Sequence, residues 1–337
     1  MKSILVTGGA GYIGSHTVVS LIESGYQPVI VDTLENSLPS ALQGIAEITN
    51  TTIPFYQVDV SDKNSLKEVF AKHPLEGVIH FAAWKAVGES VAEPLKYYHN
   101  NIQGLVVLLE VMREFGVQDI VFSSSCTVYG QPDSLPVGEN APLKQAESPY
   151  GFTKQVGEQI LSDYHTANKE SGIVLLRYFN PIGAHPSSAI GELPLGTPNN
   201  LVPFITQTAA GIRQQLTVFG SDYNTPDGTC IRDYIHVCDL ADAHVKALEW
   251  LSNNPKKIDV FNVGTGRGNT VLEVISAFEK ASGQKLNYSI GERRAGDVEQ
   301  VFADNAKATS ELKWKAKYSL EDCLLHAWQW QEKLKEA

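Results

Sequence analysis

Short apolar runs alternate with amphipathic stretches through the first half of the chain. The runs are rich in β-branched and aromatic residues, which is typical of buried strands, and the stretches between them repeat their apolar residues at helical spacing. Strands that alternate with helices pair in parallel through right-handed crossovers, so the pattern predicts an α/β fold with a Rossmann-type doubly wound sheet. The expected strands cover 3–8, 28–33, 54–60, 77–83, 119–125 and 172–180, and the expected helices cover 15–25, 65–73 and 101–116.

The pattern changes after Asn180. Residues 181–232 contain frequent Pro and Gly and several polar loops, which indicates a smaller, loop-rich α/β domain at the C-terminal end. We therefore expect a first domain at 1–180 and a second, substrate-binding domain at 181–337. The stretch 236–251 again has helical spacing and 260–266 again has the character of a buried strand, so we expect both to pack back on the first domain.

Composition and charge narrow the classes of function. Apolar residues make up 43% of the 337 residues and charged residues 19%, as in an ordinary globular protein. The net charge of −11, without a dominant basic stretch, argues against nucleic acid or an anionic membrane as a partner. The N-terminal residues lack a signal-peptide core and no apolar run is long enough to span a bilayer, so we expect a cytoplasmic protein.

The cysteines and histidines indicate neither a disulfide framework nor a metal site. No two cysteines have a CxxC or otherwise paired spacing, which in a chain of this length favours free thiols in a reducing compartment. The nine histidines form no HExxH-type ligand pair, so we expect no metal. The cysteines are Cys126, Cys230, Cys238 and Cys323.

Three glycines follow the first expected strand. Gly8, Gly11 and Gly14 form G-x-x-G-x-x-G before an amphipathic helix, a pattern that lets backbone N–H groups approach a pyrophosphate at the helix N-terminus. Asp32 ends the next strand, where a carboxylate would accept a ribose 2′-hydroxyl and repel a 2′-phosphate, which favours NAD over NADP. A tight turn alone would also explain the glycines, but the β-α-β context favours a dinucleotide site. Asp59, at the end of the third expected strand, is either an adenine-edge partner or a solvated carboxylate.

A hydroxyl-rich strand end and a Tyr-x-x-x-Lys helix lie close together in the chain. Ser125 ends the strand 119–125, and Ser148 can cap a helix whose first residue is Pro149. Tyr150 and Lys154 then lie on one face of that helix. An ammonium about 4 Å away would contribute roughly 4 kcal/mol at an effective dielectric near 20, or about three pKa units, enough to bring a tyrosine pKa of ~10 into the working range of a base. A half-exposed Tyr and a solvated Lys are the alternative, but the glycine loop and the serine-ended strand favour catalysis.

Eight sequence motifs, spread over nearly the whole chain, form one set. They are TGGAGYIGSH (7–16), HFAAWKAVGES (80–90), FSSSCTVYG (122–130), SPYGFTK (148–154), RYFNPIGAHPS (177–187), PNNL (198–201), RDYIHVCDLADAHV (232–245) and RRAGD (293–297). With this set the chain resembles the extended short-chain dehydrogenase/reductases, and among them the UDP-glucose 4-epimerase family. Each motif alone is shared by many relatives, whereas the set is specific.

The resemblance implies a NAD-dependent isomerase that interconverts UDP-galactose and UDP-glucose in galactose metabolism. Tyr150 would act as base on the sugar 4-hydroxyl while a hydride passes from carbon 4 to tightly bound NAD. The 4-keto sugar would then turn and take the hydride back on its opposite face. Lys154 would lower the pKa of Tyr150 and hold the nicotinamide ribose, and Ser125 would bond the same sugar oxygen. Residues 1–180 would form the NAD-binding Rossmann domain and 181–337 the UDP-sugar domain.

The resemblance also implies contact residues, position by position. The cofactor set is Gly8, Gly11, Tyr12, Ile13, Gly14, Asp32, Thr33, Leu34, Glu35, Asn36, Ser37, Asp59, Val60, Phe81, Ala82, Ala83, Lys85, Asn100, Ser123, Tyr150, Lys154 and Phe179. The substrate set is Lys85, Ser125, Tyr150, Asn180, Asn200, Leu201, Thr217, Val218, Phe219, Arg232, Tyr234, Arg294, Asp297 and Val301. Within it, Arg232 and Arg294 would pair with the diphosphate, and 217–219 would form a strand beside uracil.

Departures from relatives of the same fold bear on the reaction. Cys126 and Thr127 stand where sugar-nucleotide dehydratases carry an Asp–Glu pair for eliminating water, which disfavours a dehydratase. Val301 stands where some relatives have a tyrosine; it either packs as a strand residue or leaves space for a 2-acetamido group, so that UDP-GlcNAc and UDP-GalNAc would also be used. A UDP-glucuronate epimerase or decarboxylase and a NAD-binding redox sensor stay open as alternatives. A homodimer through 101–116 and the helix from Pro149 is expected from the family, although packing on the sheet also explains their apolar residues.

Overall fold

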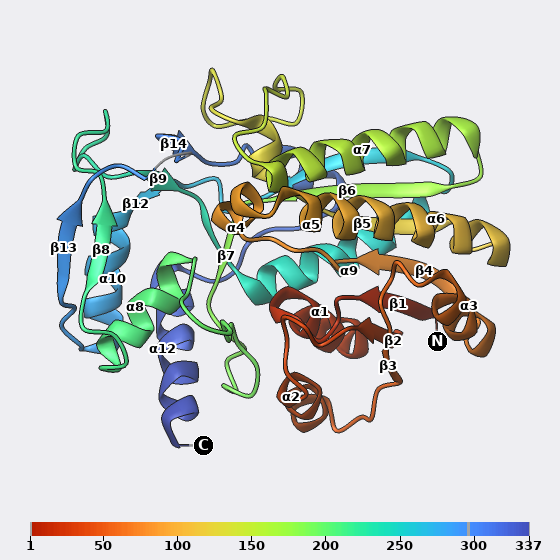
Figure 1. Cartoon of the computed structure of the whole chain (residues 1–337), viewed down its shortest axis with the longest axis horizontal. Coiled ribbons are helices and arrows are strands. Elements are labelled where there is room, and N and C mark those ends of the chain that lie inside the picture. The colour runs from red at the N-terminus through yellow and green to blue at the C-terminus, as the bar shows by residue number, and fades with distance from the viewer. Residues whose placement is uncertain (1, 295–296, 337) are drawn as a thin grey trace.

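A seven-stranded parallel sheet forms the centre of the fold (Figure 1). The computed structural model describes residues 2–294 and 297–336. The strand order is β11-β6-β5-β4-β1-β2-β3, so the direction of winding reverses between β1 and β4. This confirms the predicted doubly wound sheet. The strands are β1 (Ser3–Thr7), β2 (Gln27–Asp32), β3 (Phe55–Gln57), β4 (Leu75–His80), β5 (Asp119–Ser125), β6 (Gly172–Tyr178) and β11 (Ile258–Val263).

Helices cover both faces of this sheet and bury one core against each. Successive strand residues point to opposite faces, so Ile4 packs into one core and Leu5 into the other. The first core includes residues of α1, α2 and α9, and the second includes residues of α3, α6 and α7. These helices are α1 (Tyr12–Glu23), α2 (Ser40–Thr49), α3 (Lys63–Lys72), α6 (Gly104–Phe115), α7 (Pro149–Ala167) and α9 (Val237–Asn253).

Local capping signals decide where the expected helices begin and end. Helix α3 begins after Asp62, whose carboxylate accepts hydrogen bonds from the backbone N–H groups of Asn64 and Ser65 at 3.1 and 3.2 Å. Helix α6 ends at Gly116, which adopts a left-handed φ of 71°. The first residues of the expected helix 101–116 instead belong to a π-helix, η1 (His99–Gln103).

Three strand ends differ from the prediction. The expected strand 54–60 pairs with β2 only over Phe55–Gln57, so Asp59 lies in a turn beyond the strand. The expected strand 172–180 is divided into β6 and a separate β7 (Asn180–Ile182). The expected strand 260–266 begins earlier, at Ile258, and ends at Val263.

Within the described residues, the other strands form three small sheets, and α8, α10 and α12 form a third core. β7 pairs with β10, β8 pairs with β13, and β9 lies between β12 and β14. Helices α8, α10 and α12 pack together through residues such as Ile205, Phe278 and Leu324. The elements are β8 (Leu216–Phe219), β9 (Ile231–Arg232), β10 (Tyr234–His236), β12 (Asn269–Thr270), β13 (Tyr288–Gly291), β14 (Gln300–Val301), α4 (Val87–Ala92), α5 (Pro94–Tyr98), the 3₁₀-helix η2 (Cys126–Tyr129), α8 (Leu201–Ala209), α10 (Val271–Ser282), α11 (Ala306–Glu311) and α12 (Leu320–Glu336).

Strand β11 belongs to the central sheet and helix α9 packs on that sheet, although both follow residue 180. β11 pairs with β6 from Ile258 to Val263, and α9 contributes Leu240 and Leu251 to the core shared with α1. We keep the division into domains at 1–180 and 181–337 as a proposal, in which 237–263 returns to the first domain.

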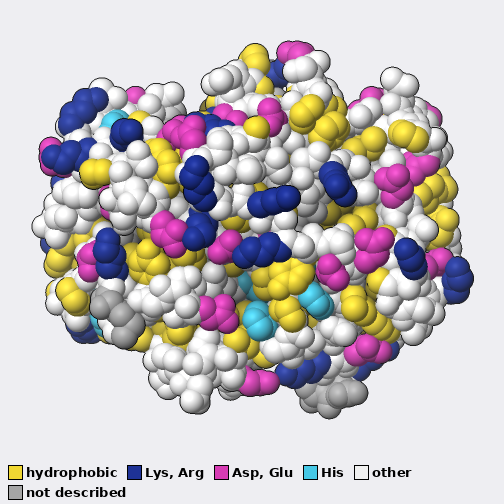
Figure 2. All heavy atoms as spheres, turned by 180° about the vertical axis from the view of Figure 1, so that it is seen from behind, with side chains coloured by type: hydrophobic (Ala, Val, Ile, Leu, Met, Phe, Trp, Pro, Cys, Tyr) yellow, Lys and Arg dark blue, Asp and Glu magenta, His cyan; other side chains and the backbone are white. Residues whose placement is uncertain are grey.

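One face of the molecule is mixed in charge. Figure 2 shows Lys and Arg side chains interspersed with Asp and Glu over one whole face, without a field of a single sign. Across residues 2–294 and 297–336, no helix combines the length and the hydrophobicity that a bilayer crossing requires. All four cysteines are free thiols.

Candidate active site

The predicted glycine loop lies between β1 and α1. Gly8 has a left-handed φ of 71°, and a Cβ there would lie 2.8 Å from the backbone nitrogen of Ala82. A Cβ on Gly14 would lie 2.2 Å from the carbonyl oxygen of Gly8. The loop therefore needs glycine at both positions, and it leads into a helix whose first N–H groups have no intrahelical partner. The next predicted residues, Tyr12 and Ile13, begin α1.

Asp32 organises the loop after β2. Its carboxylate accepts hydrogen bonds from Ala10 N at 3.1 Å, Leu34 N at 2.9 Å and Ser37 Oγ at 2.9 Å. Leu34 is held at a left-handed φ of 63°, a strained conformation for a side chain of this size. The carboxylate thus joins the glycine loop to the predicted contact residues Thr33, Leu34, Glu35, Asn36 and Ser37.

Other predicted cofactor residues follow neighbouring strands at the same edge. Asp59 is exposed, and its carboxylate accepts from Ser61 N at 2.7 Å. Val60 is buried in the core, and Phe81 lies directly after β4 with its ring centroid 4.6 Å from that of His244. Ala82, Ala83 and Lys85 continue the segment after β4, and Asn100 lies in η1.

The structure brings the two hydroxyl-bearing stretches together. Ser125 is the last residue of β5, and Ser148 caps α7 by accepting a hydrogen bond from Gly151 N at 3.1 Å. Tyr150 and Lys154 are both buried on the first turns of α7. The Lys154 ammonium donates to the Ser123 carbonyl at 2.6 Å and lies 5.9 Å from the centroid of the Tyr150 ring.

The pKa of Tyr150 differs from the expectation. Burial raises the pKa of Tyr150 above its ordinary value, the nearby Tyr178 raises it further, and a hydrogen bond with Ser125 opposes the rise. Burial also lowers the pKa of Lys154 to about 8. The predicted lowering of the Tyr150 pKa is not seen because the Lys154 ammonium bonds to Ser123 rather than to the phenol.

Four predicted substrate residues come together in the second half. Asp297 accepts from Arg294 Nη2 at 2.8 Å and lies 3.8 Å from Arg232 Nη2. The Arg294 guanidinium lies 5.6 Å from the centroid of the Phe219 ring. The cluster has two cations and one anion, so it retains a positive charge that suits a diphosphate. Ala295 and Gly296 of the RRAGD motif lie outside the described residues.

The other predicted substrate residues lie on the short strands of the second half and at the start of α8. In β8, Val218 is buried while Thr217 is exposed. Tyr234 of β10 is paired with Asn180 of β7, and Val301 of β14 is paired with Arg232 of β9. Val301 is buried in a small apolar cluster with Phe179, and Leu201 begins α8.

Glu192 joins two predicted substrate residues that are far apart in the sequence. Its Oε1 accepts from Asn200 Nδ2 at 2.6 Å and lies 3.4 Å from Lys85 Nζ. The cation of Lys85 is therefore already paired with an anion. Neither motif matching nor spacing pointed to Glu192, because its partners come from other segments.

Comparison with known proteins identifies the family. A family model described as GDP-mannose 4,6 dehydratase matches residues 5–326. The UDP-glucose 4-epimerase of Bacillus subtilis (strain 168) is 55% identical over 329 residues, which are 98% of this chain and 96% of that protein. The chain belongs to the UDP-glucose 4-epimerase family.

Two solved structures of UDP-glucose 4-epimerases agree with this assignment. One, from Stenotrophomonas maltophila with bound NAD and formylated UDP-arabinopyranose, has a TM-score of 0.97 and 48% identity, and the match covers 100% of this chain and 99% of that one. The other, from Bifidobacterium longum in complex with NAD⁺ and UDP, has a TM-score of 0.96 and 47% identity over 98% of each chain.

The dehydratase description of the family model does not extend to the residues at this site. Cys126 and Thr127, which follow Ser125 in the 3₁₀-helix η2, provide a thiol and a hydroxyl. Burial raises the pKa of the Cys126 thiol to about 12, so it is not a useful acid or base at neutral pH. The structure thus agrees with an epimerase site that lacks the carboxylate pair for eliminating water.

Sequence reasoning missed several residues that hold the site together. Asn101 donates to Trp84 O at 3.0 Å and to Thr153 Oγ1 at 3.1 Å, and so joins the segment after β4 to α7. The fully buried Asp233 accepts from Gly266 N at 3.0 Å and Ala303 N at 3.1 Å, directly beside Arg232. Asp233 was visible as the middle letter of the RDY motif, whereas the contacts of Asn101 are long-range and gave no local signal.

Proposed function

We propose that this protein interconverts UDP-galactose and UDP-glucose through a 4-keto sugar, as a NAD-dependent UDP-sugar 4-epimerase. The observation that carries the proposal is the group of Ser125, Tyr150 and Lys154 at the carboxyl edge of the central sheet. The same sheet carries the glycine loop after its strand β1. The neighbouring positions, Cys126 and Thr127, have no carboxylate. The relative from Bacillus subtilis is a UDP-glucose 4-epimerase, which supports the proposed activity.

The residues of the first half fit NAD. A Cβ would collide with the backbone at Gly8 and Gly14, so both positions need glycine for the tight turn that would present backbone N–H groups to a pyrophosphate. A carboxylate accepts about four hydrogen bonds, and Asp32 has capacity for a ribose hydroxyl beyond its bonds to Ala10, Leu34 and Ser37. When bound, NAD accepts a hydride from sugar carbon 4 and returns it, so that the reaction has no net oxidation. The matching structures from Stenotrophomonas maltophila and Bifidobacterium longum contain NAD or NAD⁺.

The chain's own residues handle the proton. As the C4–H bond breaks and C4=O forms, the proton of the sugar 4-hydroxyl passes to the phenolate oxygen of Tyr150, and the reverse transfer restores both groups. Ser125 would donate a hydrogen bond to the same sugar oxygen, since its Oγ is fixed as acceptor for Thr127 N at 3.2 Å. Lys154, anchored on the Ser123 carbonyl, would stabilise charge on Tyr150 and reach the nicotinamide ribose.

The second half would bind the UDP group. Arg232 and Arg294 would exchange part of their contact with Asp297 for the diphosphate, and Phe219 lies beside Arg294 at the end of β8, the strand proposed for uracil. Asn180, Asn200 and Tyr234 would contact the sugar and phosphate. The Bifidobacterium longum epimerase structure holds UDP, which supports this assignment of the second half.

Replacing Tyr150 tests the proposal against a NAD-binding redox sensor. Tyr150→Phe keeps the ring but removes the proton acceptor, so epimerisation should fall by roughly 10²- to 10⁴-fold, while NAD stays bound. Tyr178→Phe is the matched control, because it removes a neighbouring buried phenol that bonds to Ser123. A sensor would show no epimerisation in the wild type and little change in either variant.

A UDP-glucuronate enzyme is the nearest rival. Such an enzyme needs a cation for the sugar carboxylate, and Lys85 is the nearest candidate among the proposed sugar contacts. The carboxylate of Glu192 lies 3.4 Å from the Lys85 ammonium and would repel a second carboxylate. This contact favours a neutral sugar.

We also propose that UDP-N-acetylhexosamines are accepted. Val301 is buried beside Phe179 and is the direct register partner of Arg232, so its small side chain would border the sugar rather than the solvent. Turnover of UDP-GlcNAc by the wild type tests this. A rate below about a thousandth of that with UDP-glucose, a loss of roughly 4 kcal/mol in the transition state, would contradict it.

We further propose a cytoplasmic homodimer. On the helices expected to form the interface, Phe152 of α7 and Val106 and Phe115 of α6 are exposed. Val91 and Leu95, on α4 and α5 beside α7, are more exposed still, at 62% and 79%. Apolar side chains gathered on one surface mark protein contacts. Light scattering of the wild type and of Leu95→Glu tests the assembly, and a monomeric wild type would contradict it. The free cysteines fit a reducing compartment.

A further inference from the structure

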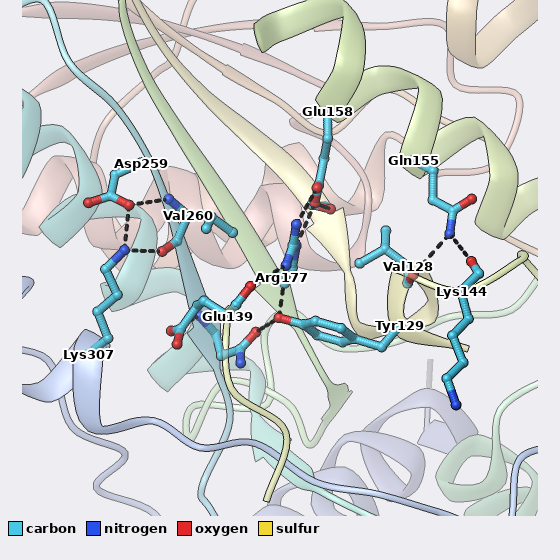
Figure 3. A network of polar contacts seen from close by, with 12 residues as sticks. Val128, Tyr129, Glu139, Lys144, Gln155, Glu158, Arg177, Asp259, Val260 and Lys307 are labelled. Carbon is cyan, nitrogen blue, oxygen red and sulfur yellow. Dashed lines mark hydrogen bonds and ion pairs between the residues drawn. The ribbon is translucent and has the colours of Figure 1, made fainter. Parts of the chain in front are cut away.

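A buried ion pair lies about one helical turn along α7 from Lys154. Glu158 and Arg177 form a bidentate contact, with Nε–Oε1 at 2.8 Å and Nη2–Oε2 at 2.6 Å, and both side chains are only 7% exposed (Figure 3). Glu158 follows Lys154 by four residues, so the two lie on the same face of α7. Burying two charges costs about as much as their attraction returns, so stability alone does not account for such a pair.

The pair is bonded to the segment that carries Ser125. The hydroxyl of Ser124, the preceding residue of β5, donates to Glu158 Oε1, while the Ser123 carbonyl accepts from Lys154. Two successive residues of β5 are therefore bonded to two side chains one turn apart on α7. This arrangement sets the position of the β5 end relative to Tyr150.

The far side of Arg177 is fixed as well. Its Nη1 donates to the Tyr129 hydroxyl at 3.0 Å and to the Glu139 carbonyl at 3.2 Å (Figure 3). The Tyr129 hydroxyl donates in turn to Asn262 Oδ1 at 2.6 Å, in β11. Since the guanidinium is bonded on both sides, the carboxylate of Glu158 cannot move without breaking this network.

Within the described part of the chain, Glu158 is the anionic side chain whose charge favours the protonated form of Lys154. Burial lowers the pKa of the Lys154 ammonium to about 8, and the charge of Glu158 opposes that shift. His80, from β4, is neutral because burial lowers its pKa to about 3. The titratable and charged groups around Lys154 come from β4, β6 and α7. They are His80, Tyr178, Tyr150, Glu158 and, paired with Glu158, Arg177.

We propose that Glu158 is a positioning residue for the epimerase, which keeps the Lys154 ammonium charged and in place and is itself held by Arg177. The inference rests on the proposed function. A neutral Lys154 would no longer stabilise negative charge on Tyr150, so the proton transfer would slow. Arg177 has the complementary task of keeping Glu158 ionised and immobile.

The pH dependence of Glu158→Gln tests this role. The substitution keeps the size of the side chain but removes the anion and leaves the charge of Arg177 uncompensated near Lys154. We expect the alkaline limb of the kcat/KM profile for UDP-galactose to move to lower pH by about one unit. The double variant Glu158→Gln/Arg177→Gln removes both charges, so its limb should lie between those of the single variant and the wild type. NAD content and melting temperature are measured alongside.

The outcomes separate a positioning role from a structural one. A structural role predicts a lower melting temperature and an equal loss of rate at every pH, and an unmoved alkaline limb in Glu158→Gln would overturn the proposal. If the single variant does not fold, the double variant decides, because its limb must still lie below that of the wild type. A wild type without epimerase activity would refute the proposed function instead. The role of Glu158 would then be tested by ¹⁵N NMR titration of the Lys154 ammonium, where an equal pKa in wild type and variant overturns it.

Discussion

Replacing Gly14 with alanine should release NAD without unfolding the protein. A Cβ at this position would lie 2.2 Å from Gly8 O and 2.8 Å from Gly9 Cα, both backbone atoms that cannot rotate away. The loop must therefore open by about 1 Å, at a cost of about 1–3 kcal/mol for overpacking. The displaced peptide groups are those that would face the pyrophosphate, so we expect the cost to appear as roughly 5- to 150-fold weaker NAD binding.

The assay measures NAD content after purification and NAD affinity of the stripped protein. Gly77→Ala in β4 is the matched control, because the nearest atom to its new Cβ would be Asp119 O at an ordinary 3.4 Å. Gly77→Ala should keep its NAD. If Gly14→Ala binds NAD as tightly as the wild type and the control, the argument from close backbone approach is wrong.

Arg232→Met should raise the KM for UDP-galactose about 10- to 100-fold with a smaller change in kcat, since a charge-assisted contact contributes about 1.5–3 kcal/mol. Steady-state kinetics check this against Arg293→Met, whose guanidinium is instead paired with Asp222 at 2.7 Å. Glu192→Gln removes the anion beside Lys85 and should strengthen competitive inhibition by UDP-glucuronate about tenfold; an unchanged inhibition constant contradicts this. Burial lowers the pKa of His16 to about 3, whereas an unfolded histidine titrates near ~6.5, so the unfolded chain binds the extra proton and stability falls as pH drops below ~6.5. Thermal melts from pH 7.5 to 5 should show a falling midpoint, and a constant midpoint would refute it.

Much of the fold and the chemistry of the site could be predicted because the signals are local. The apolar runs matched the strands of the central sheet, and the cap at Ser148 followed from the Ser-Pro pair at the start of α7. The need for glycine at Gly8 followed from its place between a strand and a helix, and its φ of 71° agrees. Each of these features depends on residues close together in the sequence.

The remaining features depend on contacts between distant segments. The third strand was predicted too long because pairing with β2 stops at Gln57, which places Asp59 in a turn. The Lys154 ammonium bonds to Ser123, 31 residues earlier, and this choice of partner is invisible in the Y-x-x-x-K spacing. The distance of Glu158 from Lys154 was readable from the helix, but its pairing with Arg177 of β6 was not.

Conversion of UDP-galactose without added cofactor tests the proposed function most directly. The purified protein is mixed with UDP-galactose alone, and UDP-glucose is measured. We expect conversion, because NAD retained by the glycine loop would take up and return one hydride within each cycle. If no UDP-glucose forms even after NAD is supplied, the epimerase proposal is wrong, and the site must act on a different nucleotide sugar.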